Sequence, residues 1–130
     1  MYRWVDHTAE LELHIEAATP RDVFEEALAA YAELVGDGTE GEAVVHELWL
    51  TAPDRAALLV RWLEELIYLG ETADFVPRKV LSLDVGAQEL RARVEGVSGS
   101  PRPLVKAVTY HGLELARREG GWRARLVLDV

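Results

Sequence analysis

The sequence predicts an α+β fold: a single two-layer domain of residues 1–130, in which two helices pack on a mostly antiparallel or mixed β-sheet. Three observations lead to this prediction. Two segments repeat apolar residues at helical spacing, and a capping signal precedes each of them. Several shorter segments alternate apolar and polar residues, as half-buried strands do. The order is strand, strand, helix, strand, helix and then a run of strands, which is typical of α+β proteins.

The predicted elements follow one another through short connections. In order, they are strands at Tyr2–Val5 and Leu11–Ile15, a helix from Pro20 that stops at Gly36-Asp37-Gly38, a strand at about Ala43–Thr51, a helix from Pro53-Asp54 to Gly70, strands at about Val76–Val85 and Glu89–Glu95, a loop at Gly96–Pro103, and strands at Leu104–His111, Leu113–Arg117 and Trp122–Val130.

Each predicted helix has an N-terminal signal and an apolar face. Thr19 suits the N-cap of the first helix, and Pro20 suits its first turn. In the second helix, Trp62 and Leu66 belong to a wide apolar stripe. We expect all four tryptophans to pack in the core, because too few basic residues surround them for stacking on nucleic-acid bases.

The strands are predicted from alternation and from turn signals. Leu11–Ile15 alternates apolar with charged or polar residues, the period of a half-buried strand. Gly86-Ala87 and Gly120-Gly121 mark hairpin turns. The loop at Gly96–Pro103 is rich in glycine, serine and proline and has no periodicity. Whether this loop contacts a partner is left open by the sequence.

Composition limits the class of protein. Hydrophobic residues make up 49% and charged residues 28%, as in a globular protein. There is neither a secretory signal nor an apolar run near the roughly 18 residues that cross a bilayer, so we expect a cytoplasmic protein. The absence of cysteine excludes disulfides and thiolate chemistry. The absence of asparagine and the excess of arginine suggest a thermophile, although a GC-rich genome explains the arginine equally well.

The charge argues against tight, independent binding to nucleic acid. The net charge is −9, and Lys and Arg do not cluster. An acidic surface fits a cation or a basic protein better, although it also fits a role in solubility alone. Neither a Gly-rich phosphate loop nor a nucleophile elbow is present.

Acidic groups stand at two places that the fold can bring together. Asp6 and Glu10 lie in the connection between the first two strands, and Asp129 and the carboxylate of Val130 end the last strand. If the first and last strands are neighbours, these groups converge at one edge. Oxygen ligands of this kind select hard cations such as calcium or magnesium. Solvated acidic residues at strand ends are the alternative.

Other polar residues that suit a functional site lie near both ends of the chain. Lys106 and His111 lie in the segment Val-Lys-Ala-Val-Thr-Tyr-His-Gly, and His7 follows Asp6. The histidines suit general-base or metal chemistry, or else a hydrogen bond that fixes a loop. Lys106 suits a contact with phosphate or with a partner carboxylate, and Tyr110 a structural role.

Three segments together resemble the archease family. They are Asp-His-Thr-Ala at 6–9, Val-Lys-Ala-Val-Thr-Tyr-His at 105–111, and the C-terminal Leu-Asp-Val at 128–130. The resemblance runs almost end to end. It implies a divalent-metal site, usually described with calcium, formed by Asp6, Asp129 and Val130, with magnesium or manganese as alternatives. Glu10 departs from the aspartate that is usual in the family.

The resemblance also implies a function. Archease-like proteins are non-catalytic accessory factors of the GTP-dependent RNA-splicing ligase, and they promote guanylylation of the ligase and its repeated turnover. In this interpretation RNA is contacted only indirectly, and Lys106, His7 and His111 belong to the partner-contact surface. Two alternatives stay open. One is a small metal-dependent hydrolase with His7 or His111 as base. The other is a chaperone-like modulator of an RNA methyltransferase, also implied by the family.

Overall fold

The computed structural model describes residues 1–36 and 39–130, and the predicted α+β class is confirmed within this range. Asp37 and Gly38, part of the predicted stop of the first helix, lie outside the described residues. The elements are β1 (Tyr2–His7), β2 (Glu10–Ala17), α1 (Pro20–Gly36), β3 (Ala43–Thr51), α2 (Arg55–Ala73), β4 (Phe75–Val85), β5 (Glu89–Ser98), β6 (Ala107–Arg118) and β7 (Gly121–Asp129).

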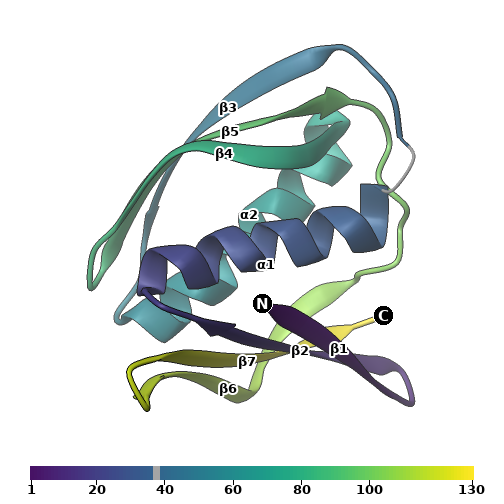
Figure 1. Cartoon of the computed structure of the whole chain (residues 1–130). Helices are drawn as coiled ribbons and strands as arrows, with labels where there is room; N and C mark the ends of the chain where they lie inside the picture. Colours follow the sequence, from purple (N-terminus) through teal and green to yellow (C-terminus); the bar gives the residue numbers. More distant parts are fainter. Residues whose placement is uncertain (37–38) are drawn as a thin grey trace.

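The strands form two antiparallel sheets with both helices between them (Figure 1). Sheet A has the strand order β1-β2-β7-β6, and sheet B has the order β3-β5-β4. This arrangement differs from the single sheet expected from the sequence. The reason lies in the helices, which are apolar on more than one side. In α2 the consecutive residues Leu58, Leu59 and Val60 are all buried, whereas one sheet requires only a single apolar stripe.

Both helices begin as the sequence predicts. The Thr19 hydroxyl accepts a hydrogen bond from the Asp22 N–H at 3.1 Å, and the Asp54 carboxylate accepts one from the Ala57 N–H at 2.8 Å. These bonds satisfy backbone donors that a helix N-terminus leaves without an intrahelical partner.

The predicted end of α2 at Gly70 is wrong. The helix continues to Ala73 and ends at Asp74, which adopts the left-handed conformation with φ of 49°. Gly70 is buried inside the helix, where a Cβ atom would lie 2.7 Å from Pro101 Cγ. This glycine therefore permits close packing of the 99–106 connection and does not mark a turn.

The core lies between the two sheets. Trp62 is fully buried, and its indole N–H donates to the Phe24 carbonyl at 2.9 Å. Trp4 and Trp122 pack against the core and are partly buried. Trp49 is 66% exposed on the outer face of sheet B, so the prediction that it packs in the core is wrong.

Two predicted boundaries in the second half change. Strand β5 continues through Gly96 to Ser98. Gly96 permits close pairing with β4, since a Cβ atom there would lie 2.1 Å from the Val76 carbonyl. The two strands predicted at 104–111 and 113–117 are a single strand, β6, interrupted by a bulge. Among the described residues, neither helix is long and apolar enough to cross a membrane.

Candidate functional site

The candidate site lies on the outer face of sheet A, which is turned away from the helices. In β2, Leu13 and Ile15 are buried on the helix side, so the alternate residues of this strand point outward. The register places Arg125 of β7 opposite His14 of β2. The outward residues of β2 are Glu10, Glu12, His14 and Glu16.

The Glu12 carboxylate is the centre of a cluster drawn from three strands. Arg125 donates from Nη2 to Oε1 at 2.6 Å and from Nε to Oε2 at 3.2 Å. His14 Nε2 lies 2.9 Å from Oε2, and His7 Nε2 lies 3.1 Å from Oε1. We call His7, Glu12, His14 and Arg125 the Glu12 cluster.

Hydrogen bonding fixes the charge at the centre of this cluster. The bond from Arg125, followed by the bond from His14, lowers the pKa of the Glu12 carboxyl from 4.5 to about 2. The same contact raises the pKa of Arg125. Only 13% of the Glu12 side chain is exposed. Glu12 is therefore an ionised anchor, and it does not exchange a proton near neutral pH.

Strand β6 has a wide bulge within the polar segment noted in the sequence. The four residues 110–113 stand opposite the single residue Leu126 of β7. Gly112 adopts a left-handed conformation with φ of 67°, which favours glycine. Tyr110 and His111 are exposed on this bulge. Bulges redirect side chains and are frequent beside functional sites.

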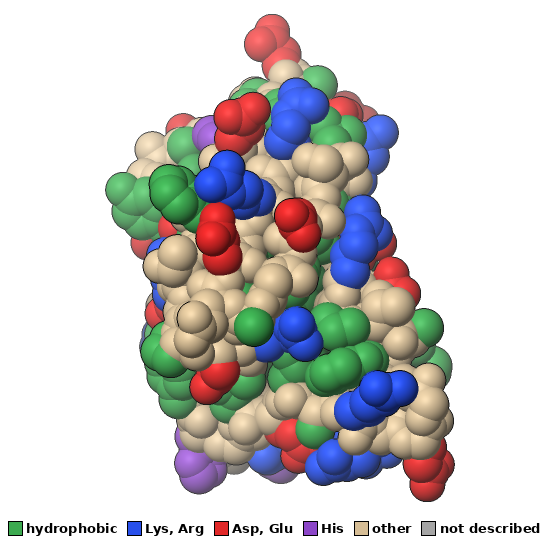
Figure 2. Space-filling view, turned by 90° about the vertical axis from the view of Figure 1, so that its left-hand side faces the viewer, with side chains coloured by type: hydrophobic (Ala, Val, Ile, Leu, Met, Phe, Trp, Pro, Cys, Tyr) green, Lys and Arg blue, Asp and Glu red, His purple; other side chains and the backbone are tan. Residues whose placement is uncertain are grey.

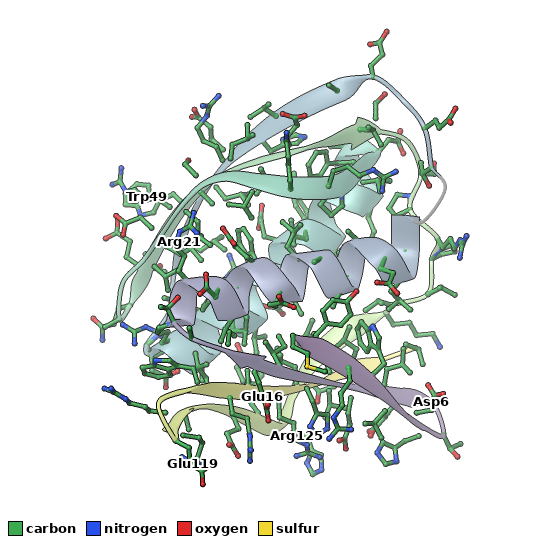
Figure 3. All side chains as sticks on the ribbon, in the orientation of Figure 1. Asp6, Glu16, Arg21, Trp49, Glu119 and Arg125 are labelled. Carbon is green, nitrogen blue, oxygen red and sulfur yellow. The ribbon has the colours of Figure 1, made fainter. Side chains whose placement is uncertain are left out.

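Arg125 joins the Glu12 cluster to the bulge. Its Nη1 donates to the Gly112 carbonyl at 3.2 Å, while Nε and Nη2 bind Glu12. Figure 3 shows Arg125 on the side of sheet A away from the helices. The segments 5–10 and 105–112, which are far apart in the sequence, are thus parts of one surface.

The predicted cation ligands lie at one end of sheet A, but the first and last strands are not neighbours. Strand β2 separates β1 from β7, so Asp6 and Asp129 are two strand spacings apart, about 10 Å. Asp6 stands opposite Leu11, and Asp129 stands opposite Glu10. Leu11 and Glu10 are consecutive and point to opposite faces, so the two aspartates also lie on opposite faces.

Val130 is tied to the β1–β2 turn. Its N–H donates to the Ala9 carbonyl at 3.3 Å, and the Asp129 carbonyl accepts from the Lys106 N–H at 2.8 Å. These bonds hold the C-terminus, marked in Figure 1, at the end of the sheet where Asp6 lies (Figure 3).

The described residues do not form a ready-made metal centre. Across 1–36 and 39–130, no group of three or more Asp, Glu or His residues is arranged to hold an ion. The opposite faces of Asp6 and Asp129 account for part of this result. The negative charge of Glu12 is already balanced by Arg125, and the positive charge of Arg125 opposes the binding of a cation beside it. Cation binding at Asp6, Asp129 and Val130 stays a prediction.

The predicted contact residues divide into two groups. His7 belongs to the Glu12 cluster, where it is oriented by a carboxylate. Lys106 is exposed immediately before β6, and His111 is exposed in its bulge, where the His111 N–H donates to the Thr109 hydroxyl at 3.2 Å. Tyr110, for which we expected a structural role, is 59% exposed.

Glu12, His14 and Arg125 were missed as site residues. Each belongs to a strand with ordinary alternation, and Glu12 and Arg125 are 113 positions apart. No local pattern links two such residues. The signal that could have found them is the strand order, which places the first hairpin beside β7.

Fold and site define a small α+β protein whose exposed polar surface suits contact with another macromolecule. The chain matches the model of the Archease protein family over residues 2–130, and it belongs to that family. It is similar to the protein named archease of Methanosarcina mazei, with 35% identity over 140 residues, covering 99% of this chain and 95% of the relative. The archease of Methanosarcina acetivorans is 32% identical over 139 residues with the same coverage.

Two solved structures have similar folds. Protein 1598 of Methanobacterium thermoautotrophicum has a TM-score of 0.75 and 28% identity, covering 99% of this chain and 98% of that one. A protein of Thermotoga maritima, described as an archease and possible chaperone, has a TM-score of 0.71 and 19% identity, covering 100% of this chain and 98% of that one. At this lower identity the likeness concerns the fold alone.

Proposed function

We propose that the protein activates the GTP-dependent RNA-splicing ligase of its host, promoting guanylylation of the ligase and its repeated turnover. One observation supports this proposal most. The segments 5–10 and 105–112, which resemble the family, belong to one surface because Glu12 and Arg125 connect them by hydrogen bonds. The surface lies on the outer face of sheet A, and Lys106 and the C-terminus lie at the end of the same sheet.

The chemistry of this surface favours contact over catalysis. A general base needs a pKa near the working pH, whereas the pKa of Glu12 is about 2. The ring nitrogens of His7 and His14 that face Glu12 are occupied by it. The role that fits this arrangement is docking on a partner, and the net charge of −9 favours a basic protein surface.

A divalent cation, with calcium first and magnesium or manganese as alternatives, is a further part of the proposal. Asp6, Asp129 and the terminal carboxylate would supply its oxygen ligands after their side chains adjust. Calorimetry should show binding that Asp6→Ala abolishes, with Asp84→Ala, an exposed carboxylate on sheet B, as control. Removal of Val130 should weaken binding, because it moves the terminal carboxylate by about 3.4 Å. Equal binding by all variants would contradict the site.

A ligation time course tests the proposed function. The reaction contains limiting ligase from the same host, excess RNA with 2′,3′-cyclic phosphate and 5′-hydroxyl ends, GTP and manganese. Substoichiometric protein should convert a single turnover into many, and Lys106→Ala should lose most of this effect while keeping its circular dichroism spectrum. Unchanged guanylylation and turnover would reject the proposal.

A second candidate is a chaperone-like modulator of an RNA methyltransferase. The family resemblance implies this role as well, and the Thermotoga maritima protein with the same fold is described as a possible chaperone. Capture of partners from a lysate of the host separates the two candidates, since ligase and methyltransferase are different proteins. Incubation with generic phosphoesters plus magnesium or manganese tests the hydrolase alternative.

A further inference from the structure

Tyr110 is a large, exposed aromatic side chain in the bulge, and its position is difficult to explain by packing. It is 59% exposed in β6, which is an edge strand of sheet A. An aromatic ring gains stability by burial, so an exposed one contributes little to the fold. Tyrosine is instead among the residues that supply most binding energy at protein interfaces.

Arg125 contacts the bulge that carries Tyr110, and we call Arg125 together with Glu12 the strut. Arg125 Nη1 binds the Gly112 carbonyl, two residues after Tyr110. A Cβ atom at position 112 would lie 2.2 Å from that Nη1. Glycine therefore serves two needs at this point: the positive φ and the close approach of the guanidinium.

The other end of the strut is fixed in the first two strands. Arg125 grips Glu12 with two nitrogens, and Glu12 is held in turn by His14 on its own strand and by His7 on β1. The chain of contacts therefore crosses all four strands of sheet A and ends at the bulge. Charge-assisted, paired hydrogen bonds of this kind fix orientation as well as distance.

We propose that Tyr110 is a contact residue through which the protein docks on its partner, and that Glu12 and Arg125 are positioning residues that hold it out. This inference rests on the proposed function, so the partner that binds at Tyr110 is the ligase. Glu114 follows the bulge directly, and the chain as a whole has a net charge of −9, so the ligase surface that receives the phenol ring is basic around its rim.

Loosening the strut should weaken docking without changing what the docked protein does. Glu12→Gln removes the charge that Arg125 grips, and Tyr110→Ala removes the ring. Each should raise the protein concentration for half-maximal stimulation of the ligase by about tenfold, as loss of one interface anchor does. Maximal stimulation should stay at the wild-type level.

Glu16→Gln is the matched control. Glu16 lies on the same strand and the same face, and it also pairs with an arginine, Arg123, at 3.4 Å. Arg123, however, has no hydrogen bond to the bulge within the described part of the chain. The control should keep the wild-type half-saturating concentration. If Glu16→Gln and Glu12→Gln behave alike, the strut is wrong.

A double variant separates positioning from a general loss of stability. If Glu12 acts through Tyr110, Glu12→Gln combined with Tyr110→Ala should be no weaker than either single variant, because coupled residues are not additive. Additive losses, near a hundredfold in total, would overturn the positioning role. A lowered maximum with an unchanged half-saturating concentration would overturn the docking role of Tyr110.

Hydrogen exchange tests whether Glu12 positions the bulge, independently of the proposed function. The amides of residues 110–113 should exchange faster in Glu12→Gln than in wild type, and Glu16→Gln should match wild type. Equal exchange in all three proteins overturns the strut whatever the ligase result. Failure of wild-type protein to stimulate the ligase overturns the proposed function and the contact role of Tyr110, while the exchange result still decides whether Glu12 positions the bulge.

Discussion

The outer faces of the two sheets carry similar side chains but organise them differently. On sheet A, Arg125 connects a carboxylate on β2 with a carbonyl on β6, and 34% of its side chain is exposed. On sheet B, Arg91 lies over the Trp49 ring at 4.8 Å and binds Glu89, two residues away on its own strand, with 65% of its side chain exposed. The first arginine joins three strands through hydrogen bonds, and the second contacts the neighbouring strand β3 and its own strand.

An ion pair between arginine and glutamate therefore contributes differently to the structure in different surroundings. Exposed pairs contribute little, since water and salt screen them. Figure 2, which views the molecule from the side where Trp49 lies in Figure 3, shows basic and acidic side chains interspersed. The shielded Glu12 cluster instead fixes the geometry of a bulge. We therefore place the working surface on sheet A.

Two glycines with positive φ offer the largest expected difference. Gly112 has φ of 67° and Gly120 has φ of 80°, so alanine at either position costs about 1–2 kcal/mol of backbone strain. At Gly120 nothing lies within 4 Å of the new Cβ, whereas at Gly112 the Cβ displaces Arg125. Urea denaturation should show a greater loss for Gly112→Ala. Equal losses would mean that Arg125 adjusts freely.

Replacing each arginine by methionine should give the next largest difference. Arg125→Met leaves the shielded Glu12 carboxylate without its main partner, which is unfavourable for a charge held away from water. Arg91→Met leaves Glu89 in solvent, with half of its side chain exposed. Thermal unfolding should therefore show a clearly lower melting temperature for Arg125→Met and little change for Arg91→Met. The reverse order would contradict the comparison.

Acid should weaken the sheet A cluster in a defined range. The pKa of Glu12 is lowered from 4.5 to about 2 in the folded protein. Its contribution to stability is therefore fully present above about pH 4.5 and is lost as the pH falls through about 2. The free energy of unfolding, measured by urea denaturation between pH 5 and 2, should fall less in Glu12→Gln than in wild type. Parallel curves would show that Glu12 is not held as an ionised anchor.

Trp49 provides the smallest expected effect. Its ring is 66% exposed and its contact with Arg91 is a surface cation–π interaction, worth about 0.5–1 kcal/mol. Trp49→Ala should change the free energy of unfolding by no more than this. A loss of several kcal/mol would mean that the outer face of sheet B is also part of a network.

Much of the fold could be predicted from the sequence because local signals decide it. Thr19 and Asp54 cap helices, and alternation in Leu11–Ile15 marks a strand. The division into two sheets could not be predicted, since it depends on how much of each helix surface is apolar and on which strands pair. Gly70 and Gly96 were interpreted as local signals, but packing against Pro101 and Val76 decides both.

The site was predicted in part. The segment around His111 was singled out because its polar residues have no evident use in folding, and the segment around His7 was singled out because its composition is unusual. Their connection was not found, because Glu12 and Arg125 meet only after β2 and β7 pair. The exposed positions of Tyr110 and Trp49 were also missed, since both aromatic residues suit a core as well as an interface.

One pair of variants tests the central claim most directly, because Tyr110 in sheet A and Trp49 in sheet B are both large, exposed aromatic residues. The measurement is ligation by limiting host ligase with GTP, manganese and RNA bearing cyclic-phosphate ends, stimulated by wild type, Tyr110→Ala or Trp49→Ala at equal, subsaturating concentration. Our account predicts that Tyr110→Ala loses most of the stimulation and that Trp49→Ala keeps it. Loss of stimulation in Trp49→Ala with full stimulation in Tyr110→Ala would place the working surface on sheet B and contradict the account.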